Sequence, residues 1–278
     1  MTHDTSIALL IDADNSPAGK IEEVLGELAK YGVINIRRAY GNWKSPHLKG
    51  WEAVLHEYAI QPMQQFDYSK GKNASDMAMV IDAMDLLYSR HLEGVALVSS
   101  DADFTPLVLR LRANGLKVLG FGEEKTPLPF VKACSLFLYL ENLGSSELAQ
   151  VPEKPVEKEG AKLLEPPPML ATKPAPVKKS TNELKGDPRL VSLLRNSVAA
   201  AADDEGWAGL GAVGQHIAKQ ASFDSRNYGY AKLRDLFSAI GLFDLQKKEK
   251  GLYVRDRRTA TRTNGESASA GDAPSLPV

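Results

Sequence analysis

The sequence is poor in the features that mark disulfide-rich, zinc-binding and membrane proteins. Its 278 residues include a single cysteine, Cys134, which excludes an internal disulfide framework and a thiolate zinc site. This cysteine stands in an apolar stretch and is predicted to be a small core residue. The first apolar segment, residues 7–11, is too short for a signal peptide, and no apolar run reaches membrane-spanning length. We therefore expect a cytoplasmic protein without a membrane segment.

A strong charge of either sign is also missing. The chain has 34 Lys and Arg against 35 Asp and Glu, so its net charge does not indicate a nucleic-acid partner. Its five histidines are scattered, and none falls within the acidic motifs described below. Any polar binding surface must therefore arise from the local arrangement of charges.

Composition changes sharply near residue 144 and divides the chain into four parts. Residues 1–143 alternate apolar runs with amphipathic segments and are predicted to form one α/β domain. Residues 144–181 are rich in Pro, Lys and Glu, a composition typical of a flexible linker. Residues 182–258 regain helical periodicity and predict a second domain. Residues 259–278 are predicted to form a disordered tail of small residues.

Several apolar runs in the first part are almost continuous, as expected of parallel strands that helices cover on both faces. Strands are predicted at residues 7–11, 33–40, 59–66, 94–99, 117–121 and 136–140. Helices are predicted between them at residues 17–31, 47–58, 76–88 and 106–113, with Ser16, Ser75 and Thr105 as N-caps. This alternation predicts a doubly wound, mainly parallel sheet built from βαβ units.

The second part has the pattern of a small α+β domain. Its periodicity predicts helices at residues 188–201, 210–220 and 228–240. Two short strands, at residues 242–245 and 251–255, are predicted to follow and to be joined by a charged turn. Three helices followed by a β-ribbon are typical of a winged helix-turn-helix.

Acidic residues follow two of the predicted strands and begin one of the helices between them. Asp12 ends the first apolar run, and Asp101 and Asp103 follow the fourth. Asp76 begins the helix that leads into the fourth strand. Ligands of open α/β sheets bind beyond the carboxyl ends of the strands. If the first and fourth strands are neighbours, these carboxylates meet in one cleft.

Such a group of carboxylates suits a hard divalent cation. Oxygen ligands without a nearby His or Cys favour magnesium or manganese over zinc. Clustered carboxylates repel one another, and a divalent cation removes that repulsion. One or two such ions can activate a water molecule and stabilise charge on phosphate oxygens, which phosphodiester hydrolysis requires.

Each acid taken alone has a simpler explanation as a helix cap or turn former. Because a Ser or Thr is predicted to cap each nearby helix, Asp12, Asp101 and Asp103 are not needed as caps. Asp76 is weaker evidence for a metal site, because an acid in the first turn of a helix also interacts favourably with the helix dipole. The joint pattern therefore favours a metal site more strongly than any single residue does.

Basic and aromatic residues near these acids are candidates for contacts with phosphates and bases. Arg37, Arg38 and Trp43 lie at the end of the second predicted strand, and Lys72 lies in the loop before Asp76. The alternative is a solvated loop with Trp43 as a half-buried anchor.

Three motifs of the first part resemble those of the NYN family, within the PIN-like superfamily of metal-dependent ribonucleases. They are Leu-Leu-Ile-Asp-Ala-Asp-Asn, Gly-Lys-Asn-Ala-Ser-Asp and Val-Ser-Ser-Asp-Ala-Asp-Phe, and they occur in the family's order within residues 7–143. The resemblance implies that Asp12, Asp76, Asp101 and Asp103 are metal ligands. It also implies that Asn15 is the polar residue that follows the first acid in this family, which makes it a candidate for substrate binding, and that the substrate is RNA.

The second part is similar to OST-HTH, or LOTUS, domains in the segment Asn-Tyr-Gly-Tyr-Ala-Lys-Leu-Arg-Asp-Leu-Phe. Such domains are associated with RNA binding and with protein docking, and they are known to follow NYN domains. Arg226, Tyr228 and Lys232 mix basic and aromatic groups there, so we predict that they contact RNA. The alternative is that these side chains belong to the core and the solvated face of a domain that docks a protein partner.

Two other functions remain open. Haloacid-dehalogenase phosphotransferases also begin with a strand followed by Asp-x-Asp, but Gly-Thr follows there, where this chain has Asn15 and Ser16. A non-catalytic RNA-binding adaptor would keep the domains without turnover, although all four acids are present. The sequence predicts no oligomeric state.

Overall fold

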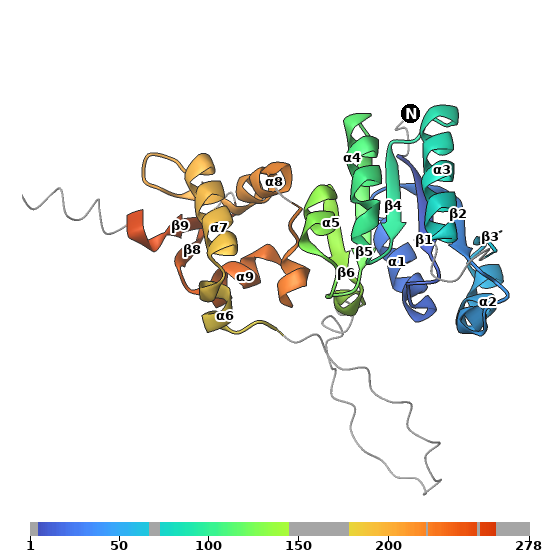
Figure 1. The fold of residues 1–278 in the computed structure, drawn as a ribbon. Coiled ribbons are helices and arrows are strands. Elements are labelled where there is room, and N and C mark those ends of the chain that lie inside the picture. Colours follow the sequence, from blue (N-terminus) through green and yellow to red (C-terminus); the bar gives the residue numbers. More distant parts are fainter. Residues whose placement is uncertain (1–4, 67–72, 145–177, 221, 249–250, 260–278) are drawn as a thin grey trace, which may run out of the picture.

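The computed structural model describes residues 5–66, 73–144, 178–220, 222–248 and 251–259 (Figure 1). These residues form an N-terminal region with two hydrophobic cores and a C-terminal region with one. Most of the predicted linker and tail lies outside the described residues, so those two assignments stay predictions. Among the described helices, none combines the length and the apolar character that crossing a membrane requires.

The N-terminal region is built on a six-stranded sheet in the order β3-β2-β1-β4-β5-β6, with every pair parallel. The strands are β1 (Ser6–Asp12), β2 (Val33–Gly41), β3 (Gln61–Gln64), β4 (Gly94–Val98), β5 (Lys117–Gly122) and β6 (Leu136–Tyr139). The predicted parallel sheet is confirmed. Strand β3 is shorter than predicted because the chain turns at Ala59, whose φ is 49°.

Helices cover both faces of this sheet, as a doubly wound fold requires (Figure 1). Leu9 of β1 faces the core that includes Trp51, whereas its neighbour Leu10 faces the core that includes Met79. The first face carries η1 (Ala18–Lys20), α1 (Ile21–Leu28), η2 (Pro46–Leu48) and α2 (Lys49–Glu57). The second carries α3 (Ala74–Ser89), η3 (Ala102–Phe104), α4 (Thr105–Ala113) and α5 (Leu128–Ala133).

The predicted N-caps of these helices are wrong. The Ser16 hydroxyl donates to the carbonyl of Val98, 3.3 Å away, and does not cap a helix. Ser75 lies inside α3, which begins one residue earlier, and its hydroxyl donates to Asp14. Thr105 is the first residue of α4, and Phe104 occupies its N-cap position. These hydroxyls therefore do not cap the predicted helices. Those of Ser16 and Ser75 instead join segments that lie far apart in the sequence.

The C-terminal region is the small α+β domain that the sequence predicts. Its elements are α6 (Thr181–Gly186), α7 (Pro188–Ala201), β7 (Ala208–Gly209), α8 (Leu210–Gln220), η6 (Ser225–Tyr228), α9 (Leu233–Ile240), β8 (Phe243–Lys248) and β9 (Gly251–Asp256). The strands form an antiparallel sheet in the order β7-β9-β8. The third predicted helix begins late, at Leu233, because Gly229 has a φ of 82° and ends the short helix η6.

Candidate functional site

The predicted acidic residues lie where the order of the strands reverses. The chain moves outward from β1 to β3 and then returns to place β4 beside β1, with Ile11 opposite Val98. Asp12 is the last residue of β1, and Asp101 follows closely after β4. Open α/β sheets bind ligands at such a reversal, beyond the carboxyl ends of the strands.

Asp12 lies deepest in this group and is 2% exposed. Its carboxylate accepts hydrogen bonds from the Ser99 hydroxyl at 2.9 Å and from the Asn15 side chain at 3.1 and 3.2 Å. Burial raises the pKa of the Asp12 carboxyl, and these donors oppose the rise. Asn15, which was predicted to bind substrate, thus holds the Asp12 carboxylate in place here.

Ser99 links the ends of β1 and β4, a role that the sequence reasoning missed. Its side chain is fully buried, and its hydroxyl also accepts a hydrogen bond from the backbone N–H of Asp101 at 3.1 Å. The place of Ser99 directly after an apolar strand was the signal for this role in the sequence. It was not sufficient, because serines are mostly exposed in proteins. The buried hydroxyl fixes Asp12 and the start of the Asp101 loop relative to each other.

Asp101 and Asp103 lie on the loop and short helix η3 that follow β4. One carboxylate oxygen of Asp101 accepts a hydrogen bond from the backbone N–H of Asp103 at 2.8 Å and so caps η3. Asp103 is exposed. Asp101 therefore acts as a cap after all, of a short helix that the sequence analysis did not predict.

Asp76, in the first turn of α3, faces the other acids. Its pKa is raised to about 6, first by burial and then by the negative charges of Asp12, Asp101, Asp14 and Asp103. Asp14 fixes this helix to the loop after β1, since it accepts a hydrogen bond from the Ser75 hydroxyl at 2.7 Å. Asp76 thus lies near enough to the other three predicted carboxylates, and to Asp14, for their charges to raise its pKa.

The donor set suits a hard divalent cation in its chemistry, since it consists of carboxylate oxygens that repel one another. It is not a preformed cage. Within the described ranges, no three His, Cys, Asp or Glu side chains are placed to hold a metal ion. A cation would therefore require some of these side chains to change position. Asp101 uses only one of its carboxylate oxygens to cap η3.

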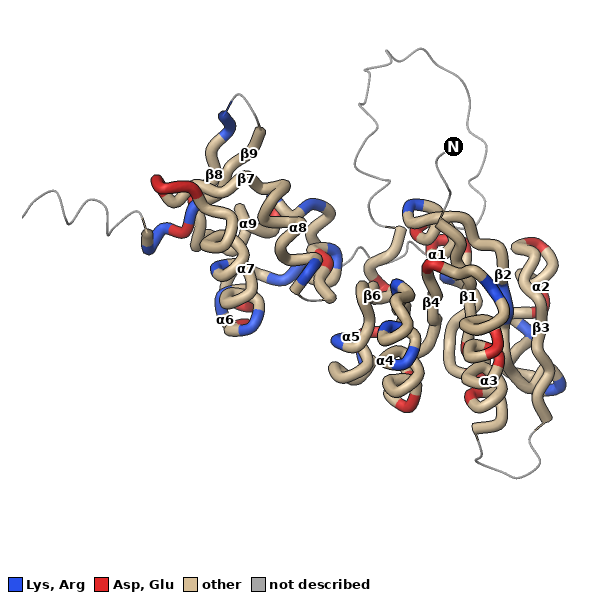
Figure 2. Tube along the Cα trace, turned by 90° about the horizontal axis from the view of Figure 1, so that it is seen from above, with Lys and Arg blue, Asp and Glu red and all other residues tan. Residues whose placement is uncertain are grey.

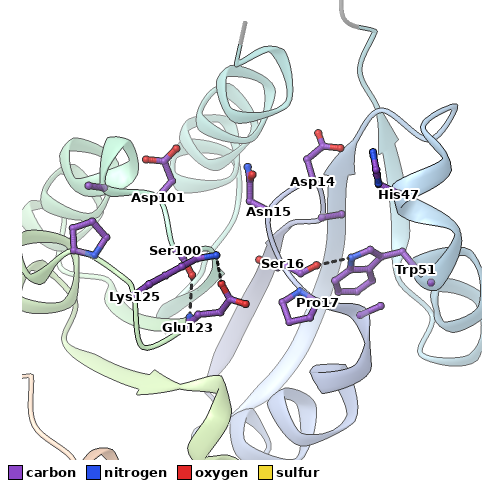
Figure 3. A pocket seen from close by; sticks show the side chains of 15 residues that line it. Asp14, Asn15, Ser16, Pro17, His47, Trp51, Ser100, Asp101, Glu123 and Lys125 are labelled. Atoms are coloured by element: carbon purple, nitrogen blue, oxygen red, sulfur yellow. Dashed lines mark hydrogen bonds and ion pairs between the residues drawn. The ribbon is translucent and has the colours of Figure 1, made fainter. Parts of the chain in front are cut away.

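A pocket of about 660 Å³ opens beside the acids. Figure 3 shows Asp14, Asn15 and Asp101 pointing to the same side of this pocket, with His47 beyond Asp14. Lys125 and Glu123 also line it, below Asp101 in this view, and their side chains pair at 2.5 Å. The pocket thus offers room for a substrate next to Asp101 and Asp14, with one further acid and one base in its lining.

The two arginines of β2 are engaged away from the acids. Arg37 donates to the carbonyl of Tyr58 at 2.8 Å. Arg38 forms an ion pair with Asp82 of α3, which also accepts a hydrogen bond from the Tyr40 hydroxyl. Figure 2 shows this basic strand β2 beside the acidic residues of α3. The structure does not bring either arginine to the acidic cluster.

Trp43 and Lys72 complete the residues predicted to bind substrate in this region. Trp43 is half-buried and packs against the core on the α1 and α2 side of the sheet, as the alternative reading expected. Its backbone N–H donates to the side chain of Gln64 at 3.1 Å. Lys72 lies outside the described residues.

The residues predicted to bind RNA in the C-terminal region separate in space. Arg226 pairs with Glu27 of α1 and with Asp224, and Tyr228 is half-buried beside Phe223. Lys232 is exposed and lines a hollow of about 610 Å³ on another side of the domain.

Comparisons with known proteins identify both parts of the chain. Residues 6–141 match the NYN domain family, and residues 185–255 match the OST-HTH/LOTUS domain family. The predicted pairing is therefore confirmed. An uncharacterized protein of Methanocaldococcus jannaschii is 34% identical over 125 residues, which cover 42% of this chain and 48% of that protein. The chain thus spans about half the length of this relative.

Two solved structures resemble parts of the chain. A crystal structure of a Vibrio parahaemolyticus protein of unknown function shares 19% identity and covers 50% of this chain and 94% of its own, with a TM-score of 0.43. A solution NMR structure of an uncharacterized Nitrosomonas europaea protein shares 31% identity and covers 36% of this chain and 92% of its own, with a TM-score of 0.24.

Proposed function

The chain carries a NYN domain followed by an OST-HTH/LOTUS domain, and on that premise we propose that it is a metal-dependent ribonuclease. The NYN domain places it in the PIN-like nuclease superfamily. In our proposal Asp12, Asp76, Asp101 and Asp103 hold Mg²⁺ or Mn²⁺. The observation that carries it is the position of Asp12 and Asp101 at the ends of the neighbouring strands β1 and β4, where the order of the strands reverses. Burial, and then the negative charges of the other acids, raise the pKa of Asp76 to about 6.

The residues of the chain divide the work in this proposal. Ser99 and Asn15 hold the carboxylate of Asp12 at a fixed position, while Asp76 and Asp101 approach from the other elements. When bound, a divalent cation supplies a water of lowered pKa and positive charge beside the phosphate oxygens. The adjoining pocket receives the RNA strand.

The C-terminal domain supports the proposal through its likeness to RNA-binding and protein-docking domains. We place its RNA contact at the hollow lined by Lys232, Arg234 and Tyr253, which offers two cations and an aromatic ring. Lys232 and Arg234 are exposed, so they can reach phosphates. A protein partner at this domain is the alternative.

Asp101→Asn tests the proposed chemistry with little disturbance of the fold, because asparagine also caps helices. The matched control is Asp85→Asn, which removes a charge from an exposed position of α3. RNA, single-stranded and structured, is incubated with each protein in Mg²⁺ or Mn²⁺. We expect Asp101→Asn to lose on the order of 100-fold or more in cleavage rate and to keep RNA binding.

Three results separate the alternatives. Cleavage that is equal in both variants and insensitive to EDTA would refute the metal-dependent ribonuclease. RNA binding without cleavage in the wild type would indicate a non-catalytic adaptor. Turnover of a phosphomonoester, but not of RNA, would indicate the haloacid-dehalogenase type of phosphatase. A cytoplasmic location belongs to the same proposal and is tested by cell fractionation.

A further inference from the structure

The open edge of the NYN sheet is contacted by the C-terminal domain. Strand β6 is the last strand of the sheet, and the short helix η6 lies against it. The side-chain amide of Asn227 donates to the carbonyl of Phe137 at 2.9 Å and accepts from the backbone N–H of Tyr139 at 3.2 Å. In a parallel sheet, a residue of the next strand bonds to the same two groups. Asn227 thus imitates one residue of a seventh strand.

An ion pair joins the same short helix η6 to helix α1 of the NYN domain. The guanidinium of Arg226 makes two hydrogen bonds to the carboxylate of Glu27, at 2.6 and 2.8 Å. Glu27 is 4% exposed. Burial alone would raise the pKa of Glu27, but hydrogen bonds from Arg226 and Lys30 lower it to about 2. A buried carboxylate with a bidentate partner is geometrically specific and is unfavourable to leave unpaired.

We propose that these contacts hold the C-terminal domain against the NYN domain in solution, so that the two domains move as one body. We call the contacts of Arg226 and Asn227 with Glu27 and β6 the interdomain latch. The inference does not depend on the proposed ribonuclease activity. It assigns to Arg226 and Asn227 a role in domain docking. The guanidinium of Arg226, which was predicted to contact RNA, is instead engaged by Glu27 and Asp224.

The rival arrangement is a pair of domains that tumble independently, as is the default for domains joined by a long connecting segment. The evidence against independent tumbling is the specific geometry of the latch contacts, not the size of the interface between the domains. Asn227 satisfies one N–H and one carbonyl group of the edge strand, and the approach of Arg226 is fixed by both Glu27 and Asp224, with which it also pairs at 2.8 Å.

Distance measurement on the full chain tests the latch directly. Lys49→Cys in α2 and Lys219→Cys in α8 introduce exposed label sites, and the native Cys134 is buried and does not need removal. Single-molecule energy transfer between dyes at these two sites reports how widely the separation of the domains is distributed. The test variant carries Arg226→Ala and Asn227→Ala. Its matched control replaces an arginine and an asparagine, both exposed, through Arg258→Ala and Asn182→Ala.

We expect one narrow distance distribution for the wild type and the control, and a broadened, shifted one for the latch variant. Glu27→Gln weakens the same contact from the NYN side and should also broaden the distance distribution. Because this substitution lies outside the C-terminal domain, unfolding of that domain is then excluded as the cause. A distribution that is already broad in the wild type would overturn the proposal. So would a latch variant that remains as narrow as the control.

Discussion

Ser99 shows how the acidic cluster depends on a residue that carries no charge. Its hydroxyl donates to the carboxylate of Asp12 and accepts from the backbone N–H of Asp101, so one side chain links the ends of two strands. It has no other role in the proposed chemistry, which makes it a positioning residue. Residues that orient metal ligands influence affinity for the metal almost as strongly as some ligands do.

Ser99→Ala is therefore expected to raise the Mn²⁺ concentration for half-maximal RNA cleavage, roughly 10- to 100-fold. The cause is loss of the hydrogen bond that fixes Asp12. Titration of cleavage rate with Mn²⁺ measures the effect. Ser100→Ala is the control, since the Ser100 hydroxyl accepts from the backbone N–H of Glu123 instead. Equal titration curves for the two variants would contradict the assigned role.

Individual residues of the site were predictable to different degrees. The places of Asp12 and Asp101 followed from their position after apolar strands. The partners of Arg38 and Arg226 did not, because Asp82 and Glu27 lie 44 and 199 positions away in the chain. A basic side chain near a strand end looks the same in the sequence whether it meets a phosphate or a carboxylate.

Among the elements, β2 and α3 are joined by a polar contact inside an apolar layer. Asp82 of α3 accepts from both Arg38 and the Tyr40 hydroxyl of β2, and Tyr40 is 1% exposed. Removal of the carboxylate leaves the buried Tyr40 hydroxyl and the partly buried Arg38 guanidinium without this partner, which is more costly than loss of the bonds themselves. This contact also joins β2 to the helix whose first turn carries Asp76.

Asp82→Ala is expected to lower the free energy of unfolding by about 2 kcal/mol. Asp85→Ala, at an exposed position of the same helix, makes the same chemical change and is expected to stay within about 0.5 kcal/mol of the wild type. Urea unfolding of both variants supplies the comparison. If the two lose equal stability, the contact between β2 and α3 contributes nothing beyond helix propensity.

The elements themselves were largely predictable, and their ends were not. Apolar runs and helical periodicity located the strands of the sheet and the helices α7 and α8, because burial of one face dictates these patterns. The short helices η6 and α5 show no helical periodicity of apolar residues in the sequence. The start of α9 depends on the positive φ of Gly229, which the sequence permits but does not require.

At the scale of the whole molecule, the two hollows at which we propose RNA contacts lie one in each domain. The first adjoins the acidic cluster, and the second is lined by Lys232 and Arg234. If the second hollow contacts phosphates, its contribution to affinity is electrostatic and decreases with salt.

Lys232→Ala with Arg234→Ala is therefore expected to weaken RNA binding at low salt and to reduce the slope of log affinity against log salt by about 1 to 2. Fluorescence anisotropy with a labelled RNA over a salt series gives both quantities. Lys185→Ala with Lys219→Ala, at exposed sites elsewhere in the domain, controls for loss of charge. Unchanged affinity in the first variant would instead make this domain a protein-docking module.

The edges of the central sheet have a consequence for the behaviour of the protein at high concentration. An uncovered edge strand offers free N–H and carbonyl groups to the same strand of another molecule and so promotes aggregation. At one edge, β3 is short and contains Pro62, which cannot donate a hydrogen bond. At the other, Asn227 occupies groups of β6 that a foreign strand would need. The contact of the second domain with β6 thereby blocks pairing of this strand with a strand of another molecule.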